Sequence, residues 1–239
     1  MACYVIADLH LDVTRPELTQ ALRTFVASLK PQDELYIIGD LFNFFVGLDP
    51  EDVAQQAVAE MMGKAHENGV ACYFIHGNRD FLLSKREAEL LNLTLLPKLY
   101  YLERFSQRLL LTHGDIFCSN DLKYQAYQRK VNNKLLQWLF RRLPLSRRRA
   151  IGAKIRQQSA SSVRYQSEIY GVVTQTVAQY CHNVDLLVHG HIHVLGTYYD
   201  EVPGLKARYV LGAWGQNLSY FKLDEQGATL YEQPLASWR

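Results

Sequence analysis

The sequence lacks several features that mark membrane-spanning, secreted and zinc-binding chains. It has no run of about 18 apolar residues, the length that a spanning helix requires. It does not begin with a basic segment followed by an apolar one, as a signal peptide does. Repeats and low-complexity linkers are also absent. The few cysteines show no Cys-x-x-Cys spacing, so we expect reduced core thiols in a cytosolic protein for Cys3, Cys72, Cys118 and Cys181.

Length and composition favour one soluble α/β domain over residues 1–239, of which 48% are apolar and 21% charged. The net charge of +2 conceals an uneven distribution. Residues 119–164 contain twelve Lys or Arg and one acid, Asp121, which gives +11 against −9 for the rest of the chain. We therefore predict a basic helical insertion at about 119–165 with an anionic partner. A solvated helix face without a partner is the alternative.

Short apolar runs that end in a polar cluster recur along the chain. Each has three to five apolar residues, too few for a helix, followed by Asp, His or Asn, often beside Gly. They occupy residues 3–10, 34–42, 71–80, 109–115 and 185–193. Runs of this kind are typical of strands that are buried on both faces.

Helical patterns separate these strands at residues 16–30, 51–68 and 84–91. The alternation of strands and helices predicts a layered α/β fold. Later in the chain, three short strands are expected to complete a second, more antiparallel sheet. They cover residues 207–214, 218–223 and 228–233.

Seven side chains with metal-binding chemistry follow the first five strands. They are Asp8, His10, Asp40, Asn78, His113, His191 and His193. Ligands gather outside the carboxyl ends of strands in such sheets, and oxygen and imidazole groups suit Mn²⁺, Fe or Zn²⁺ with open positions. Seven ligands are too many for one ion, so we expect a carboxylate such as Asp40 to bridge two ions. His189 is expected to support this set without ligating.

The strand ends resemble the motifs of the calcineurin-like metallophosphoesterases. These motifs are Asp8-x-His10, Gly39-Asp40, Gly77-Asn78-Arg79-Asp80, His113-Gly114 and Gly190-His191-x-His193. Within that superfamily, the stretches DELYIIGDLF, CYFIHGNRDFLL, YQAYQRKV and VLGAW are similar to the UDP-2,3-diacylglucosamine hydrolases of lipid A synthesis. The resemblance implies an α/β fold, a four-layer αββα sandwich with a helical lid. It also implies a pyrophosphohydrolase with two Mn²⁺ or other divalent ions that activate water.

That family cleaves UDP-2,3-diacylglucosamine to UMP and 2,3-diacylglucosamine 1-phosphate at the cytoplasmic face of the inner membrane. By resemblance, one ion would be held by Asp8, His10, Asp40 and His193, and the other by Asp40, Asn78, His113 and His191. Catalysis would depend on Asn78, Arg79 and His113. The residues expected to contact substrate are Asn78, Arg79, Asp121, Ser159, Arg164 and His191.

The chain departs from the family pattern at three places. Asn43 follows Gly-Asp-Leu-Phe, where relatives usually carry an acidic residue. Ile192 and Val194 flank the last histidine, where relatives are more polar. The insertion lacks a lysine that relatives carry, and Arg164 is expected to replace it.

Arg79 bears on the kind of bond that is cleaved. Many related enzymes carry a His there, which can protonate an alkoxide leaving group. A guanidinium cannot give up a proton, but it can hold phosphate oxygens in a bidentate fork. A phosphate leaving group, with a second pKa of about 6, departs without a proton. Arg79 therefore favours a pyrophosphate bond over an alkyl phosphate ester. An ion pair between Arg79 and Asp80 is the alternative.

The insertion also contains large apolar residues followed at once by arginines. Helical spacings occur among Leu135, Leu136, Leu139, Phe140 and Leu143, with Trp138 beside them. This profile is typical of a helix that lies in a membrane interface and binds anionic lipid. The same face can instead pack as core or receive acyl chains.

Three rival functions are open at this point. One is another metallophosphoesterase, such as a nuclease, a dinucleotide polyphosphate hydrolase, a protein phosphatase or an enzyme that cleaves a different nucleotide diphosphate. A second is a binding module that has lost catalysis, although no metal ligand of the pattern is missing. A third is a nucleic-acid binder that uses the +11 segment, which lacks a recognition motif. We expect no nucleic-acid partner.

Overall fold

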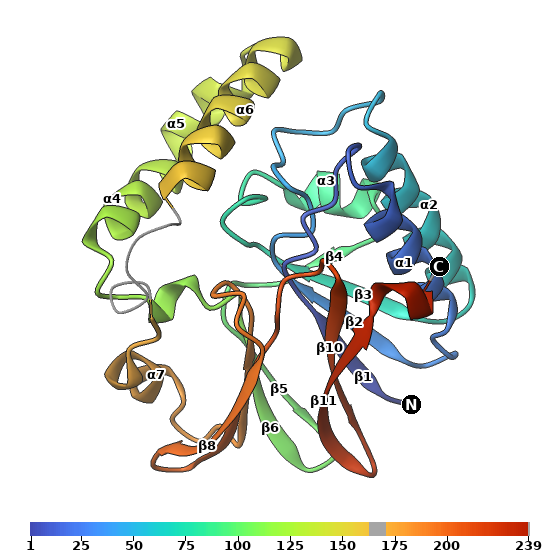
Figure 1. The fold of residues 1–239 in the computed structure, drawn as a ribbon, viewed down its shortest axis with the longest axis vertical. Helices are drawn as coiled ribbons and strands as arrows, with labels where there is room; N and C mark the ends of the chain where they lie inside the picture. Colours follow the sequence, from blue (N-terminus) through green and yellow to red (C-terminus); the bar gives the residue numbers. More distant parts are fainter. Residues whose placement is uncertain (163–170, 239) are drawn as a thin grey trace.

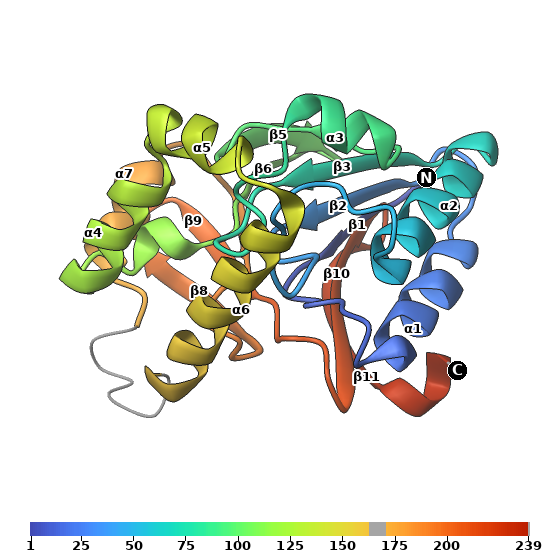
Figure 2. The same ribbon diagram turned by 90° about the horizontal axis from the view of Figure 1, so that it is seen from above.

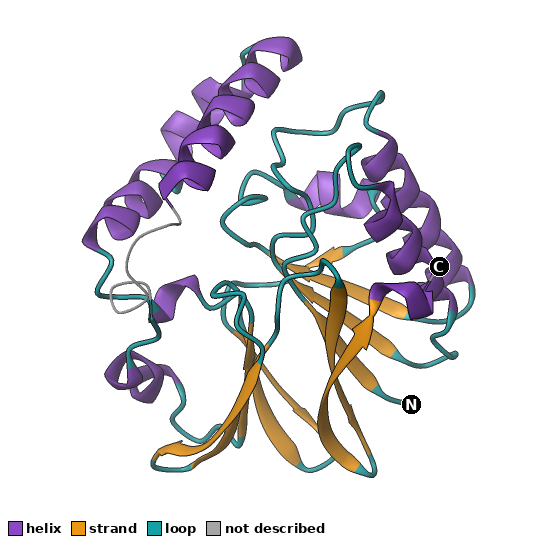
Figure 3. Cartoon of the chain, viewed as in Figure 1, coloured by secondary structure: helices purple, strands orange, loops and turns teal. Residues whose placement is uncertain are grey.

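The computed structural model describes residues 1–162 and 171–238, and it has two β-sheets packed face to face. Helices cover the outer faces of both sheets, as Figure 3 shows. The predicted layered α/β architecture is therefore confirmed. Between the sheets lies a core of apolar side chains that includes Val5, Ile38, Leu111, Val188 and Phe221.

The first sheet has six strands in the order β11-β10-β1-β2-β3-β4. Its strands are β1 (Cys3–Ile6), β2 (Glu34–Ile38), β3 (Ala71–Ile75), β4 (Thr94–Leu95), β10 (Asn217–Asp224) and β11 (Gly227–Pro234). Strands β1 to β4 are parallel to one another. All five residues of β2 are buried, as expected for a strand covered on both faces.

The second sheet has five strands in the order β5-β6-β7-β9-β8. Its strands are β5 (Tyr100–Arg104), β6 (Gln107–Leu111), β7 (Leu186–His189), β8 (Gly196–Val202) and β9 (Leu205–Val210). The central strands β6, β7 and β9 are parallel, and an antiparallel strand lies at each edge. Strand β6 ends at the same edge of the molecule as β1, β2 and β3 (Figure 1), and β7 ends there too because it is parallel to β6.

The prediction that the last three strands complete the second sheet was wrong for two of them. Strand β9 joins that sheet, but β10 pairs antiparallel with β1 in the first sheet and β11 continues beyond it. Alternate residues of β10 explain this position. Leu218 and Tyr220 face the core under the helices, whereas Phe221 and Leu223 face the core between the sheets. The strand thus buries both of its faces beside β1.

Helices α1 (Pro16–Ala27), α2 (Val53–Glu67) and α3 (Lys85–Leu90) lie on the outer face of the first sheet. The short helix η2 (Leu235–Trp238) packs with them. On the second sheet, η1 (Asp115–Phe117) and α7 (Thr174–Tyr180) form a smaller core. Helix α2 begins where the Asp52 side chain accepts hydrogen bonds from the amides of Ala54 and Gln55, and α3 begins with a capping box. The three predicted helical ranges are confirmed, with shorter ends.

Three helices follow η1 in the predicted insertion: α4 (Leu122–Val131), α5 (Lys134–Arg141) and α6 (Leu145–Ser162). Phe140 of α5 packs against the main core, and Arg141 forms an ion pair with Glu87. From α6, Arg148 donates a hydrogen bond to the Val46 carbonyl in the loop after β2. Viewed from above, α6 runs beside the loops that follow β1 and β2 (Figure 2). The insertion therefore lies at the edge where the parallel strands end.

Two other expectations concern burial and membrane crossing. The four cysteines are buried, as expected of core thiols. Across residues 1–162 and 171–238, no helix combines the length and the apolar character that crossing a bilayer requires.

Candidate metal centre

The seven predicted ligands come together where strands of both sheets end. Asp8 and His10 follow β1, Asp40 follows β2, and Asn78 follows β3. From the second sheet, His113 follows β6, and His191 and His193 follow β7. Parallel strands bring their carboxyl ends to one edge, so the topology accounts for this meeting of residues far apart in sequence.

The backbone at this edge is unusual. Among the described residues, eleven non-glycine residues have positive φ, and five of them are predicted ligands. These five are Asp8, His10, Asp40, His191 and His193, with φ between 50° and 71°. Left-handed backbone costs about 1–3 kcal/mol at a non-glycine residue and is concentrated at functional sites. The fold therefore accepts strain in order to turn these side chains toward one point.

Two glycines let the main chain approach the carboxylates closely. A Cβ at Gly77 would collide with the Asp40 carboxylate, and one at Gly190 would collide with the Asp8 carboxylate. The amide of His191, next to Gly190, donates a hydrogen bond of 2.8 Å to Asp8 Oδ2. The Gly-Asn and Gly-His pairs of the sequence thus have a steric cause.

The side chains form two contiguous groups. In the first, His193 Nε2 lies 3.3 Å from Asp8 Oδ1 and 3.3 Å from His10 Nε2. In the second, the Asn78 side-chain oxygen lies 2.9 Å from His113 Nε2 and 3.0 Å from His191 Nδ1.

Asp40 lies between the two groups. Its carboxylate oxygens are 3.8 Å from His10 Nδ1 and 3.7 Å from His113 Nε2. This is the place at which a bridging ligand is expected.

Among the described residues, two sets of side chains could each hold a metal ion, because the ligand atoms within each set all lie within 4.8 Å of one another. They are Asp8, His10 and His193, and Asp8, Asp40 and His113. Both sets fall within the seven predicted ligands. Asp8 belongs to both sets, although the family resemblance implied that it holds only one ion, so bridging by Asp40 stays a prediction.

Unsatisfied polar atoms indicate that a cation fits here. In the part of the chain that the structure describes, Asp8 Oδ1 and His10 Nδ1 are buried and accept or donate no hydrogen bond. A buried carboxylate oxygen without a hydrogen bond costs free energy that a cation would offset. The donor set is all oxygen and imidazole, which suits Mn²⁺ or another divalent ion of that hardness.

Protonation of the histidines follows from the same crowding. Burial, with Arg79 nearby, lowers the pKa of His10 to about 3, and burial beside His113 lowers the pKa of His191 to about 4. Both rings are therefore neutral at pH 7, which is the form that binds metal. For His113, burial is outweighed by the Asp40 and Asp8 carboxylates, which raise its pKa to about 9. The two carboxylates therefore favour a proton on the His113 ring, and a bound cation would supply the positive charge in place of that proton.

Arg79 points toward Asp40 and not toward Asp80. Its Nε lies 3.4 Å from Asp40 Oδ2, and its Nη1 donates a hydrogen bond of 3.0 Å to Asn43 Oδ1. Asp80 is fully buried and accepts hydrogen bonds from the amides of Leu41 and Gly77, each 2.8 Å long. Asp80 thus fixes two loops of the site, and the alternative pairing of Arg79 with Asp80 is wrong. The Arg79 side chain remains 28% exposed and accessible to a substrate.

The other predicted residues lie in different surroundings. His189 is fully buried and its Nε2 accepts a hydrogen bond from Arg208, so it supports the strand end without joining the ligands. Asp121 is buried at the start of α4, where it accepts a hydrogen bond from the Tyr124 amide. The Ser159 side chain and the whole of Arg164 lie outside the described residues. The substrate contacts of these three residues stay predictions.

Tyr124 and Gln128 of α4 were not among the site residues predicted from the sequence. The Tyr124 ring lies 5.4 Å from the His191 ring, and the Gln128 amide donates to Asp115 at 2.9 Å. These contacts join the insertion to the metal-centre edge of the second sheet. Both residues belong to the YQAYQRKV stretch that carries the family resemblance, and this was the available signal.

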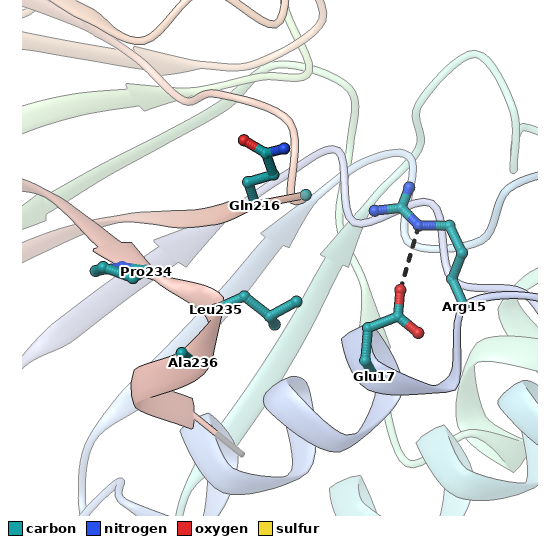
Figure 4. A pocket seen from close by; sticks show the side chains of 7 residues that line it. Arg15, Glu17, Gln216, Pro234, Leu235 and Ala236 are labelled. Carbon is teal, nitrogen blue, oxygen red and sulfur yellow. Dashed lines mark ion pairs between the residues drawn. The ribbon is translucent and has the colours of Figure 1, made fainter.

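A pocket of about 560 Å³ lies away from this centre, between the start of α1 and the strands near the C-terminus (Figure 4). It is lined by residues that include Arg15, Gln216 and Leu235. The Arg15 Nε atom lies 3.8 Å from Glu17 Oε1. None of the seven predicted ligands is among the described residues around it. The pocket is therefore separate from the metal centre.

Comparisons with known proteins agree with the geometry. Residues 1–195 match the calcineurin-like phosphoesterase family. The chain is 43% identical to the UDP-2,3-diacylglucosamine hydrolase of Pasteurella multocida, over 93% of this chain and 94% of that protein. Against the enzyme of the same name from Edwardsiella ictaluri the identity is 42%, over 98% and 93% respectively. A third, from Haemophilus influenzae, is 41% identical over 94% and 95%. The chain belongs to the calcineurin-like phosphoesterases and, within them, to the family of UDP-2,3-diacylglucosamine hydrolases.

Proposed function

We propose that this protein hydrolyses the pyrophosphate bond of UDP-2,3-diacylglucosamine to UMP and 2,3-diacylglucosamine 1-phosphate. Relatives of that name cover nearly the whole chain at 43% and 42% identity. The observation that carries the proposal is the cluster of seven oxygen and imidazole side chains at one edge of two sheets. Two buried carboxylates and the neutral imidazoles of His10 and His191 are groups that would hold cations, which suits a reaction in which negative charge grows on phosphoryl oxygens.

Asp8, His10 and His193 would hold one divalent ion, and Asn78, His113 and His191 the other, with Asp40 between them. Mn²⁺ is the ion that we propose. Two such ions, when bound, supply positive charge to the phosphoryl oxygens and activate water near neutral pH. The orphaned atoms Asp8 Oδ1 and His10 Nδ1 support this assignment.

The residues beside the ligands orient the substrate. Arg79 holds oxygens of the diphosphate in its bidentate fork, and its positive charge stabilises the negative charge that develops on the departing phosphate. The side-chain oxygen of Asn78, itself a proposed ligand, lies 2.9 Å from His113 Nε2 and 3.0 Å from His191 Nδ1, so these three atoms would hold the same ion. The leaving phosphate needs no proton, so a guanidinium in place of a proton donor fits this reaction.

Helix α5 suits contact with the acyl chains or the bilayer that holds them. Leu135, Trp138 and Leu139 are 64%, 49% and 49% exposed, which is unusual for large apolar residues on one short helix. The Arg142 guanidinium lies 3.9 Å from the centre of the Trp138 ring, so cationic and apolar groups are side by side. We propose that this face docks peripherally on the anionic inner membrane from the cytoplasmic side.

The test is a comparison of substrates with purified protein and Mn²⁺. UMP release from UDP-2,3-diacylglucosamine should exceed, by orders of magnitude, hydrolysis of bis-p-nitrophenyl phosphate and of a dinucleoside polyphosphate. Preference for the diester or the dinucleotide would favour another metallophosphoesterase. No hydrolysis of any of the three by metal-loaded protein would favour a binding module. Retention of a nucleic acid at 150 mM salt would favour the third rival.

A further inference from the structure

A row of polar contacts leads from the metal centre to the insertion. Arg79, beside Asp40, donates to the side-chain oxygen of Asn43 at 3.0 Å. The other end of the same amide, Nδ2, donates to Asp12 Oδ2. That carboxylate oxygen also lies 3.7 Å from Nη1 of Arg156 on α6. Asn43 is therefore the link between the guanidinium at the metal centre and a carboxylate outside it.

The chemistry of this link is specific to an amide. Asn43 must accept a hydrogen bond from an arginine and donate one to a carboxylate at the same time. A carboxamide has both an acceptor oxygen and donor hydrogens, whereas a carboxylate at this place would accept only. With Asp12 as its acceptor, the Asn43 amide has one orientation, and its oxygen faces Arg79.

Both ends of the link are held by the main chain. The backbone N–H of Asn43 donates to the Leu11 carbonyl at 3.0 Å, in a short parallel bridge between the loops after β1 and β2. The other oxygen of Asp12 accepts from the Thr14 amide at 2.7 Å, which leaves Oδ2 for Asn43. The side chains of Asn43 and Asp12 thus have little freedom to turn away from Arg79.

We propose that Asn43 and Asp12 are positioning residues for Arg79. Asn43 holds the guanidinium beside Asp40 through its oxygen, and Asp12 fixes the Asn43 amide in the orientation that allows this. Neither residue touches the reacting atoms, and both act through Arg79. The inference rests on the proposed role of Arg79 in hydrolysis of the diphosphate.

A purely structural role for Asn43 and Asp12 predicts different behaviour. If Asn43 and Asp12 only brace the loops after β1 and β2, their variants should lower the melting temperature. Their effect on activity should then be the same with and without Arg79. Action through Arg79 predicts that the effect disappears when Arg79 is removed. A double-mutant cycle therefore separates the two roles.

The cycle uses Asn43→Leu, Arg79→Ala and the double variant, and a second cycle uses Asp12→Asn in the same way. Turnover of UDP-2,3-diacylglucosamine is measured with Mn²⁺ at saturation, beside the melting temperature of each variant. Asn43→Leu should lower kcat by about 10- to 100-fold, as partners of a functional side chain commonly do. Asp12→Asn keeps an acceptor oxygen for the amide, and it should cost less than Asn43→Leu.

In the Arg79→Ala background, neither Asn43→Leu nor Asp12→Asn should lower kcat further. Arg149→Gln is the matched control, because it removes another contact of α6, the ion pair with Asp49, and should keep parental kcat. Parental kcat in Asn43→Leu, or the same fold loss with and without Arg79, would overturn the inference. An inactive parent protein would instead refute the proposed function, so the two failures are distinguishable.

Discussion

Replacement of Arg79 by alanine removes two contacts seen in the structure and one that we propose with substrate. The lost contacts are the approach of Nε to Asp40 at 3.4 Å and the hydrogen bond to Asn43 at 3.0 Å. Asp80, the group that a structural arginine would have paired with, keeps its bonds to two backbone amides. We therefore expect the Arg79→Ala fold and its melting temperature to remain close to those of the parent.

The kinetic loss is set by the contact with the diphosphate. A hydrogen bond between charged groups contributes about 1.5–3 kcal/mol, and about 1.4 kcal/mol corresponds to tenfold in rate. Loss of the fork should thus lower kcat by about 10-fold to about 150-fold. Arg79→Lys keeps the charge without the fork and should fall between the parent and Arg79→Ala. Arg79→His should also be impaired on the pyrophosphate, and it should gain on an aryl or alkyl phosphodiester, most of all on the alkyl ester, whose alkoxide leaving group benefits from a proton donor.

The assay is UMP release from UDP-2,3-diacylglucosamine over a range of substrate concentrations, so that kcat and KM are obtained separately. A fall in kcat shows an interaction made in the transition state. A raised KM with parental kcat would show that Arg79 only binds substrate. Parental values of both constants in Arg79→Ala would refute the reasoning, although the metal centre would stand.

Three further predictions concern the metal centre and α5. Asp40→Asn should abolish hydrolysis and lower the bound Mn²⁺ toward one ion or none; elemental analysis checks this, and full activity with two ions would contradict it. Gly77→Ala should reduce Mn²⁺ affinity, measured by calorimetry, because the new Cβ would displace the Asp40 carboxylate; unchanged affinity would show that the loop yields. Leu135→Ser with Leu139→Ser should weaken binding to anionic vesicles in a flotation assay, whereas Leu90→Ser, which changes an exposed leucine of α3, should not; equal binding of all variants would refute docking through α5.

The meeting of the seven predicted ligands at one edge was predictable from sequence because each follows a short buried strand. An apolar run that ends in Asp, His or Asn carries its own evidence, since a polar cluster at a strand end is costly without a partner. The order of these runs then placed the side chains at one edge through the topology of parallel strands. Positive φ at residues such as Asp8 and His193 has no comparable signal in the sequence.

The positions of the last strands were not predictable in the same way. Runs such as LSYFKL indicate a strand, but they do not say which strand is the neighbour. Strand β10 lies beside β1 because the Trp214 backbone N–H donates a hydrogen bond to the Asp8 carbonyl. In addition, Leu218 packs in the core under the helices and Phe221, on the other face of the strand, packs in the core between the sheets. Those are tertiary contacts, and they override the local pattern.

The basic insertion shows another limit of sequence. A run of arginines at 147–149 predicts free positive charge, yet two of the three are used within the molecule. Arg148 donates to the Val46 carbonyl, and Arg149 forms ion pairs with Asp49 and Glu51. Partners from the loop after β2 cannot be assigned from spacing alone. The charge available to an anionic partner is therefore smaller than the count of basic residues indicates.

The central claim, a metal-dependent cleavage of a pyrophosphate bond at the seven-residue centre, has one direct test. Purified protein is treated with EDTA, dialysed and titrated with Mn²⁺, while ³¹P NMR follows UDP-2,3-diacylglucosamine. We predict no turnover after chelation, and recovery with Mn²⁺ that gives UMP and the acylated sugar 1-phosphate in equal amounts. Turnover that persists without metal, or metal-loaded protein that leaves the pyrophosphate bond intact, would contradict the account.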